Sequence, residues 1–208
     1  MGLWNRYVMP ALVSCGCASP AMRYYRKRVV PQATGRVLEL GCGSGLNFSF
    51  YDPARVTALT AVEPDPRMLG WAAERRDELS GIPVDLIESG IEDAGIADES
   101  VDTAVVTFVL CTIPDWRSSL NELRRVLKPG GQILFCEHGL APDADVARWQ
   151  RRIEPIWKRL AGGCHLTRSV SDQLDEGGFE VPALEAGYTP KTPRVAGYVS
   201  WGRAALRH

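Results

Sequence analysis

The stretch Glu39-Leu40-Gly41-Cys42-Gly43-Ser44-Gly45 decides the fold, because it ends a short apolar strand and begins a sharp bend. Glycines at such a point let the backbone approach a ligand closely and adopt dihedral angles that other residues avoid. A dinucleotide-binding loop would place its third glycine at position 46, where this chain has Leu46, so the spacing is G-x-G-x-G instead. The bend therefore predicts a ligand site at the carboxyl end of the first strand.

Apolar strands alternate with helical stretches on both sides of this bend. We expect strands at Arg36 to Leu40, Thr57 to Glu63, Val84 to Ile87, Val101 to Val109 and Gln132 to Cys136. We expect helices at Ser44 to Tyr51, Arg67 to Leu79, Ser118 to Leu127, Ala144 to Leu160 and Val170 to Glu176, with Lys128 to Gly131 ending the third of them. This alternation predicts a doubly wound α/β fold with a mostly parallel sheet, and two closing strands form an antiparallel edge hairpin at the C-terminus.

The second strand ends at Glu63, about twenty residues beyond the glycines, where an acidic side chain reaches ribose hydroxyls in such folds. Either feature alone has a simpler explanation, since glycines also form tight turns. Both features lie at carboxyl ends of neighbouring strands, where open α/β sheets form ligand crevices. Together they favour a ligand that carries a ribose.

Composition limits the classes of partner. The chain has 208 residues and a formal net charge of -1, which favours one domain and argues against nucleic acid as a partner. Its six cysteines show no C-x-x-C spacing, so we expect no metal site and reduced thiols in a cytoplasm.

Residues 1–34 form a leader ahead of the first strand. An apolar run from Val8 to Ala18 is followed by Arg23 to Arg28, the reverse of the charge order in a secretory signal, and it is too short to span a bilayer. A helical lid over the ligand site is one interpretation, supported by the aromatic or apolar side chains of Trp4, Tyr7, Met9, Tyr24 and Tyr25. Peripheral contact of the basic segment with the inner membrane surface is the other.

Three segments carry a family resemblance: VLELGCGSG at 37–45, AVEPD at 61–65 and RRVLKPGG at 124–131. They resemble class I S-adenosylmethionine methyltransferases over roughly residues 35–140. The resemblance implies a Rossmann-like seven-stranded sheet in a domain at 35–208, with S-adenosyl-L-methionine as cofactor and S-adenosyl-L-homocysteine as product.

The same resemblance implies the residues that bind the cofactor. By this resemblance, Glu39 and the 41–45 loop would hold the methionine end of the cofactor, and Glu63 would bind its ribose. Pro64 and Ile91 would contact the adenine. Gly90 stands where the family usually has an adenine-contacting Asp. The full expected set is Glu39, Gly41, Cys42, Gly43, Gly45, Glu63, Pro64, Met68, Gly90, Ile91, Glu92, Thr107 and Phe108.

A narrower likeness concerns the acceptor. Segments at 108–113, 135–138, 149–150, 155–157 and 163–168 resemble membrane-associated alkyl-thiol S-methyltransferases and, more distantly, ubiquinone and menaquinone C-methyltransferases. The favoured acceptor is a small thiol or sulfide, methylated by in-line displacement. A phospholipid amine or a quinone-precursor carbon remains an alternative, as does a non-catalytic S-adenosylmethionine sensor. A NAD-linked oxidoreductase is disfavoured by Leu46. No oligomeric state is predicted.

A thiol reacts as its thiolate, so a base or a positive field near the acceptor would help. The candidates are His138, His165 and Asp115, although a histidine at a strand end is often structural and Asp115 precedes a helix that it could cap. Arg168 could pair with Glu137 or Asp172. Trp149 and Trp157, eight residues apart, could line an apolar pocket or pack in the core.

Overall fold

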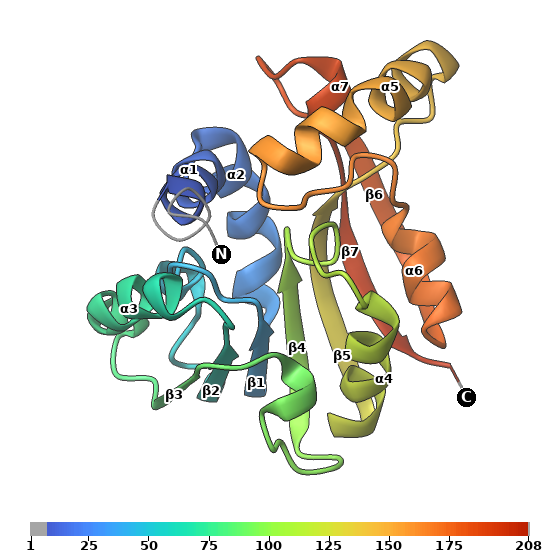
Figure 1. The fold of residues 1–208 in the computed structure, drawn as a ribbon. Helices are drawn as coiled ribbons and strands as arrows, with labels where there is room; N and C mark the ends of the chain where they lie inside the picture. Colours follow the sequence, from blue (N-terminus) through green and yellow to red (C-terminus); the bar gives the residue numbers. More distant parts are fainter. Residues whose placement is uncertain (1–7, 208) are drawn as a thin grey trace.

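The structure is a computed structural model and describes residues 8–207. A single seven-stranded sheet runs through the chain in the order β3-β2-β1-β4-β5-β7-β6 (Figure 1). Its strands are β1 Gly35–Leu40, β2 Val56–Val62, β3 Val84–Ile87, β4 Val101–Thr107, β5 Leu127–His138, β6 Phe179–Tyr188 and β7 Tyr198–Leu206. The first five strands pair in parallel, and β7 pairs antiparallel with both β5 and β6. The predicted mostly parallel sheet with an antiparallel C-terminal edge is confirmed.

Helices cover both faces of the sheet (Figure 1). They are α1 Met9–Cys17, α2 Pro20–Val29, α3 Pro66–Glu74, α4 Trp116–Val126, α5 Ala144–Leu160, α6 Val170–Glu176 and α7 Arg194–Gly197. Short 3-10 turns lie at η2 Val30–Gln32, η3 Phe48–Phe50, η4 Arg76–Leu79 and η5 Ile91–Asp93. Among the described residues, no helix is both long enough and apolar enough to cross a bilayer.

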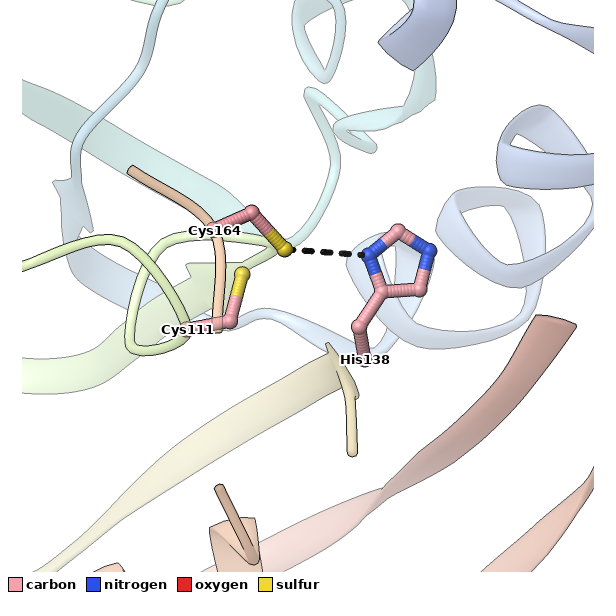
Figure 2. Close-up of side chains that lie close together, drawn as sticks. All are labelled: Cys111, His138 and Cys164. Carbon is pink, nitrogen blue, oxygen red and sulfur yellow. Dashed lines mark hydrogen bonds between the residues drawn. The ribbon is translucent and has the colours of Figure 1, made fainter. Parts of the chain in front are cut away.

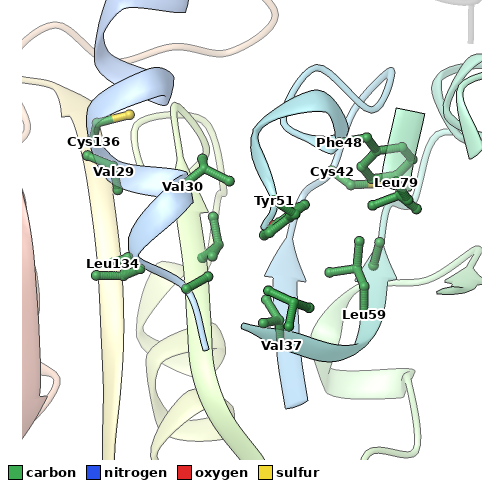
Figure 3. Packing of buried hydrophobic residues seen from close by; sticks show 14 of the residues in the cluster. Val29, Val30, Val37, Cys42, Phe48, Tyr51, Leu59, Leu79, Leu134 and Cys136 are labelled. Atoms are coloured by element: carbon green, nitrogen blue, oxygen red, sulfur yellow. The ribbon is translucent and has the colours of Figure 1, made fainter. Parts of the chain in front are cut away.

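Two apolar cores result, one on each face, because neighbouring strand residues point to opposite sides. Val37 belongs to the core that α2 covers, and Leu38 belongs to the core that α4 and α6 cover. Figure 3 shows the first core, where Val29 lies beside Cys136 of β5. This two-sided burial is what a doubly wound sheet requires.

Capping residues fix where the helices around the site begin. Asp65 accepts hydrogen bonds from the backbone N–H groups of Arg67 and Met68, and Pro66 opens α3. Asp115 caps α4 by accepting from the N–H of Ser118. Capping is therefore the role in which the structure places Asp115.

The predicted helix from Ser44 to Tyr51 is wrong. Turns and the short η3 occupy this stretch, because Gly41, Gly43 and Gly45 all have positive φ angles, of 63°, 55° and 73°. A right-handed helix cannot begin in a backbone that returns repeatedly to the left-handed region.

Three other boundaries differ from expectation. The helix expected to reach Leu79 stops at Glu74, because Arg75 leaves helical geometry at ψ 8° and η4 follows. Strand β4 ends at Thr107, since Phe108 has a φ of 55°. Lys128 to Gly131 do follow the end of α4, but they form the start of β5, next to a shift in the β4–β5 register.

Candidate active site

A cavity of about 270 Å³ lies at the carboxyl ends of β1, β2 and β4, with α1 across it. The glycine bend contributes Gly41, Cys42, Gly43, Ser44, Leu46 and Asn47. The loops after β2 and β4 contribute Glu63, Asp65, Phe108, Val109 and Thr112, while Thr107 ends β4 and Met68 lies in α3. The helices contribute Met9, Pro10, Val13, Ser14, Cys17 and Arg26, and Gly162 follows α5. The fold thus forms a crevice where parallel α/β sheets bind ligands.

The carboxylate of Glu63 faces the glycine bend. Its Oε2 accepts a hydrogen bond of 3.0 Å from the N–H of Gly43, and its Oε1 accepts one of 2.9 Å from the N–H of Asp65. Burial raises the pKa of Glu63, while these two N–H groups lower it. The arrangement predicted from sequence, an acidic group held against a bend free of side chains, is present. A ribose diol could donate to this carboxylate.

Glu39 plays a different part from the direct ligand contact that the resemblance implied. The side chain is 1% exposed, and it is absent from the cavity lining formed by the described residues. Its Oε1 accepts from Nδ2 of Asn47 at 2.9 Å, and its Oε2 accepts from the hydroxyl of Tyr51 at 2.7 Å. Burial raises the pKa of Glu39 to about 7, although both hydrogen bonds lower it. Glu39 therefore holds Asn47 in place from behind.

Asn47 is a site residue that the sequence analysis missed. Its Nδ2 also donates to Oγ1 of Thr107 at 2.9 Å, which fixes the amide on the cavity wall. Its Oδ1 is buried and has no hydrogen-bond partner among the described residues. A buried acceptor without a donor is costly, so this atom suits a ligand that brings an N–H group, such as the amino group of a methionine moiety.

The other residues expected to bind the cofactor divide into two groups. Gly41, Cys42, Gly43, Glu63, Met68, Thr107 and Phe108 line the cavity. Gly45, Pro64, Gly90, Ile91 and Glu92 do not belong to the lining that the described residues form. Ile91 packs in the core beneath α4, and Glu92 accepts from the hydroxyl of Ser119 at 2.6 Å. Gly45 is needed for packing, since a Cβ there would lie 2.9 Å from the Phe48 ring.

Arg26 is the second residue that the sequence analysis missed, because it was grouped with the basic segment Arg23 to Arg28. It is 5% exposed and lines the cavity, whereas Arg23, Lys27 and Arg28 are exposed. Its Nη1 donates to the carbonyl of Cys17 at 2.6 Å, and its guanidinium lies 5.0 Å from the Phe108 ring centre.

A helical pattern could have found it. Met22, Tyr25, Arg26 and Val29 form the buried face of α2 at the spacing of a 3.6-residue helix, so Arg26 is on the inner face by position alone.

The two tyrosines of α2 that were expected in the lid, Tyr24 and Tyr25, have different surroundings. Tyr24 is 50% exposed, whereas the buried hydroxyl of Tyr25 is hydrogen bonded to the hydroxyl of Thr189, the residue that follows β6. Trp4 and Tyr7 lie outside the described residues.

A second cavity of about 290 Å³ adjoins the first and shares Val13, Cys17, Phe108 and Thr112 with it. Most of its wall is apolar, from Leu12, Ala21, Met22, Trp157, Leu160, Ala161 and Ala196. Its polar wall includes Cys111, His138 and Cys164, which come from three separate segments and point toward one another (Figure 2). Two adjoining cavities are what a donor and an acceptor require.

Among the three catalytic candidates, His138 lines this second cavity, with its ring centre 5.0 Å from that of Phe108. His165 points elsewhere, and its Nδ1 lies 3.2 Å from Oε1 of Glu154. Neither cavity, as formed by the described residues, includes His165 or Asp115. The structure therefore brings one of the three to the site.

The loop between the cavities is fixed by Glu137. This carboxylate is 1% exposed and accepts from the N–H groups of Val109 at 2.7 Å, Leu110 at 3.1 Å and Cys111 at 3.2 Å. Burial raises the pKa of Glu137 to about 7 against these hydrogen bonds. The suggested ion pairs of Arg168 with Glu137 or Asp172 are wrong.

Arg168 instead donates to the carbonyls of Leu110 and Ile113, both at 2.7 Å, from the other side of the same loop.

The two tryptophans of α5 point in different directions, since Trp157 lines the second cavity and Trp149 is 55% exposed. Eight residues amount to about 80° around a helix, which is enough to separate a buried from an exposed direction.

We predict that Glu63→Ala weakens binding of S-adenosylmethionine about a hundredfold, because it removes a charged acceptor for the ribose and frees the Gly43 N–H. Titration calorimetry measures the change. The matched control is Glu74→Ala, which removes an exposed carboxylate from α3. Equal affinity in the Glu63 variant and the control would contradict this assignment.

Comparison with known proteins agrees with this geometry. A family model described as a methyltransferase domain matches residues 38–135. The chain is 38% identical over 152 residues to thiol S-methyltransferase TMT1B of Rattus norvegicus, covering 72% of this chain and 62% of that protein. It is 32% identical over 177 residues to thiol S-methyltransferase TMT1A of Homo sapiens, covering 81% of this chain and 71% of that protein. The matches thus span about two thirds of these relatives' length.

Solved structures agree on the fold. A SAM-dependent methyltransferase from Methanosarcina mazei superposes with a TM-score of 0.66 at 18% identity, covering 91% of this chain and 99% of that one. At this identity the likeness concerns the fold alone. Combined with the family model, the relatives and the Glu63–Gly43 cradle, it leads to one conclusion: the chain belongs to the class I methyltransferases, whose methyl donor is S-adenosylmethionine.

Proposed function

We propose that this protein transfers the methyl group of S-adenosylmethionine to the sulfur of a small, apolar thiol. The observation that carries the proposal is the second cavity, which is mostly apolar and opens beside the donor cavity. The relatives named thiol S-methyltransferases support the choice of sulfur as the acceptor atom. A non-catalytic sensor would have no use for an acceptor cavity of this kind.

The donor, when bound, supplies a methyl group on a sulfonium that is already a good leaving group, so the protein's task is alignment and exclusion of water. Glu63 and Asn47 offer acceptors that orient the donor. Phe108 lies between the two cavities and is held by the charge of Arg26 over its ring. The acceptor side must stabilise a thiolate, and its polar groups are Cys111, His138 and Cys164.

We predict that a mass-spectrometric screen finds thioethers from apolar alkyl and aryl thiols, and little product from amines, phenols, quinone precursors or phosphatidylethanolamine. Trp157→Ala should raise KM for a bulky apolar thiol about tenfold, because it removes an aromatic wall of the second cavity. Trp149→Ala is the matched control on the same helix, where the side chain is exposed. Faster methylation of an amine or carbon acceptor would refute the thiol assignment.

We also propose that the leader acts as a lid. Helix α1 contributes Met9, Val13 and Ser14 to the donor cavity, and the Ser14 and Ser44 hydroxyls are hydrogen bonded at 2.7 Å. This contact ties the leader to the glycine bend.

We predict that deletion of residues 1 to 20 lowers cofactor affinity and turnover by about tenfold or more, because water then reaches the donor site. Calorimetry and initial rates measure both quantities, and a cooperative melting curve shows that the truncated chain still folds. Unchanged affinity together with unchanged turnover would remove the lid.

Peripheral membrane contact is a further proposal. Leu12 and Leu160 line the second cavity and are 48% and 58% exposed, so they stand at its mouth. On α2, Arg23, Lys27 and Arg28 are exposed. An apolar thiol dissolved in a bilayer could enter the cavity from such a surface, and the cations would contact anionic headgroups.

We predict that the protein co-sediments with vesicles containing an anionic lipid and binds neutral vesicles at least tenfold more weakly. Replacing Arg23, Lys27 and Arg28 by Gln should abolish this difference. The control replaces Arg36, Arg76 and Arg203, which are exposed elsewhere on the chain. If the two triple variants lose binding equally, the contact is general charge attraction and the proposed surface is wrong.

A further inference from the structure

Cys111, His138 and Cys164 form a cluster in the structure, although they lie far apart in the sequence and match no local metal-binding motif. Cys111 lies in the loop after β4, His138 ends β5, and Cys164 lies in the turn after α5. Their sulfur and nitrogen atoms all lie within 4.8 Å of one another, and Nδ1 of His138 is 3.9 Å from Sγ of Cys164 (Figure 2). Both cysteines are buried, and all three side chains line the second cavity.

We propose that these three side chains bind a zinc ion whose fourth coordination position opens to the second cavity. Two thiolates and one imidazole are ligands that zinc prefers, and catalytic zinc sites keep three protein ligands with one open position. In a tetrahedral site with normal bond lengths, neighbouring ligand atoms lie about 3.5 to 3.8 Å apart. Since the ligand atoms lie within 4.8 Å of one another, each pair needs to approach by at most about 1.3 Å.

The backbone around the cluster is held in place from several directions. The Glu137 carboxylate accepts a hydrogen bond from the N–H of Cys111, and the carbonyl of Cys111 accepts one of 2.8 Å from the N–H of His165. The second contact joins the segment of Cys111 to the segment of Cys164. Gly162 and Gly163, with φ angles of 60° and 89°, make the turn that brings Cys164 inward. A site held this way needs little reorganisation to accept an ion.

A buried hydrogen-bond donor beside the sulfurs supports the geometry. The indole Nε1 of Trp157, which lines the same cavity as the two sulfurs, is buried and has no hydrogen-bond partner among the described residues. A negatively charged sulfur would satisfy that donor.

A zinc ion here would supply a positive charge that stabilises the acceptor thiolate. This role rests on the proposed function, whereas the site itself does not. The thiol R–SH binds the open position and releases its proton to solvent, which leaves a zinc-bound thiolate. The thiolate sulfur forms a bond to the methyl carbon as the carbon–sulfonium bond breaks. The electron pair of the broken bond stays on the donor's sulfur, so thiolate and sulfonium both become neutral thioethers.

Metal content of the tag-free, full-length protein tests the site. After purification with added zinc and gel filtration, elemental analysis should find one zinc per chain in the wild type and almost none in Cys111→Ser, His138→Ala or Cys164→Ser. Cys15→Ser and Cys136→Ser, one exposed and one in the core, are matched controls that should keep the ion. Calorimetric binding of S-adenosylmethionine shows that each variant is folded.

A spectroscopic measurement on the wild type does not depend on any variant. Cobalt(II) should give a thiolate charge-transfer band and the intense visible bands of a tetrahedral site. Added alkyl thiol should shift those visible bands, because it occupies the fourth position.

Equal zinc content in the wild type and the three ligand variants overturns the site, as does a cobalt spectrum without thiolate bands. A Cys111–Cys164 disulfide, mapped by peptide mass spectrometry in protein that takes up no zinc, also overturns it. Zinc bound without methylation of any thiol refutes the proposed acceptor and leaves the site standing.

Discussion

The hydrogen bond from the N–H of Gly43 to the Glu63 carboxylate is the contact on which the donor site depends. It joins the ends of β1 and β2, and it holds a backbone with positive φ angles in one conformation. Two other buried carboxylates act in the same way at neighbouring strand ends. Glu39 orients Asn47, and Glu137 binds three successive N–H groups of the loop after β4. Each strand end thus provides a fixed acceptor that shapes the loop beside it.

These carboxylates have a cost that their neighbours offset only in part. Burial raises the pKa of both Glu39 and Glu137 from the ordinary value of 4.5 to about 7, so ionisation of each is disfavoured in the fold. A group of this kind contributes stability below its unfolded pKa, and that contribution is lost as the pH rises through the folded value. The site therefore contains buried acidic groups whose pKa lies near neutrality, as ligand sites often do.

The sheet and its glycine bend could be predicted from the sequence because both are encoded locally. The strand runs, the capping Asp115 and the acidic Glu63 each depend on a few neighbouring residues. The helix expected after the bend was wrong because the alternating glycines outweigh helical propensity there. Burial of Arg26 was missed although its helical position indicated it, since charge was given more weight than spacing. The cluster of Cys111, His138 and Cys164 could not be predicted, because its members are brought together by three different loops.

Helix α2 connects the beginning of the chain to its end. Tyr25 is hydrogen bonded to Thr189 at 3.1 Å across 164 residues of sequence, and its ring lies 5.0 Å from that of Trp201 in β7. Contacts between such distant segments close large loops and form slowly. During synthesis, the leader emerges first but acquires these partners last. Until β7 is in place, α2, which carries Arg26 into the wall of the donor cavity, therefore lacks the contacts of Tyr25 with Thr189 and Trp201.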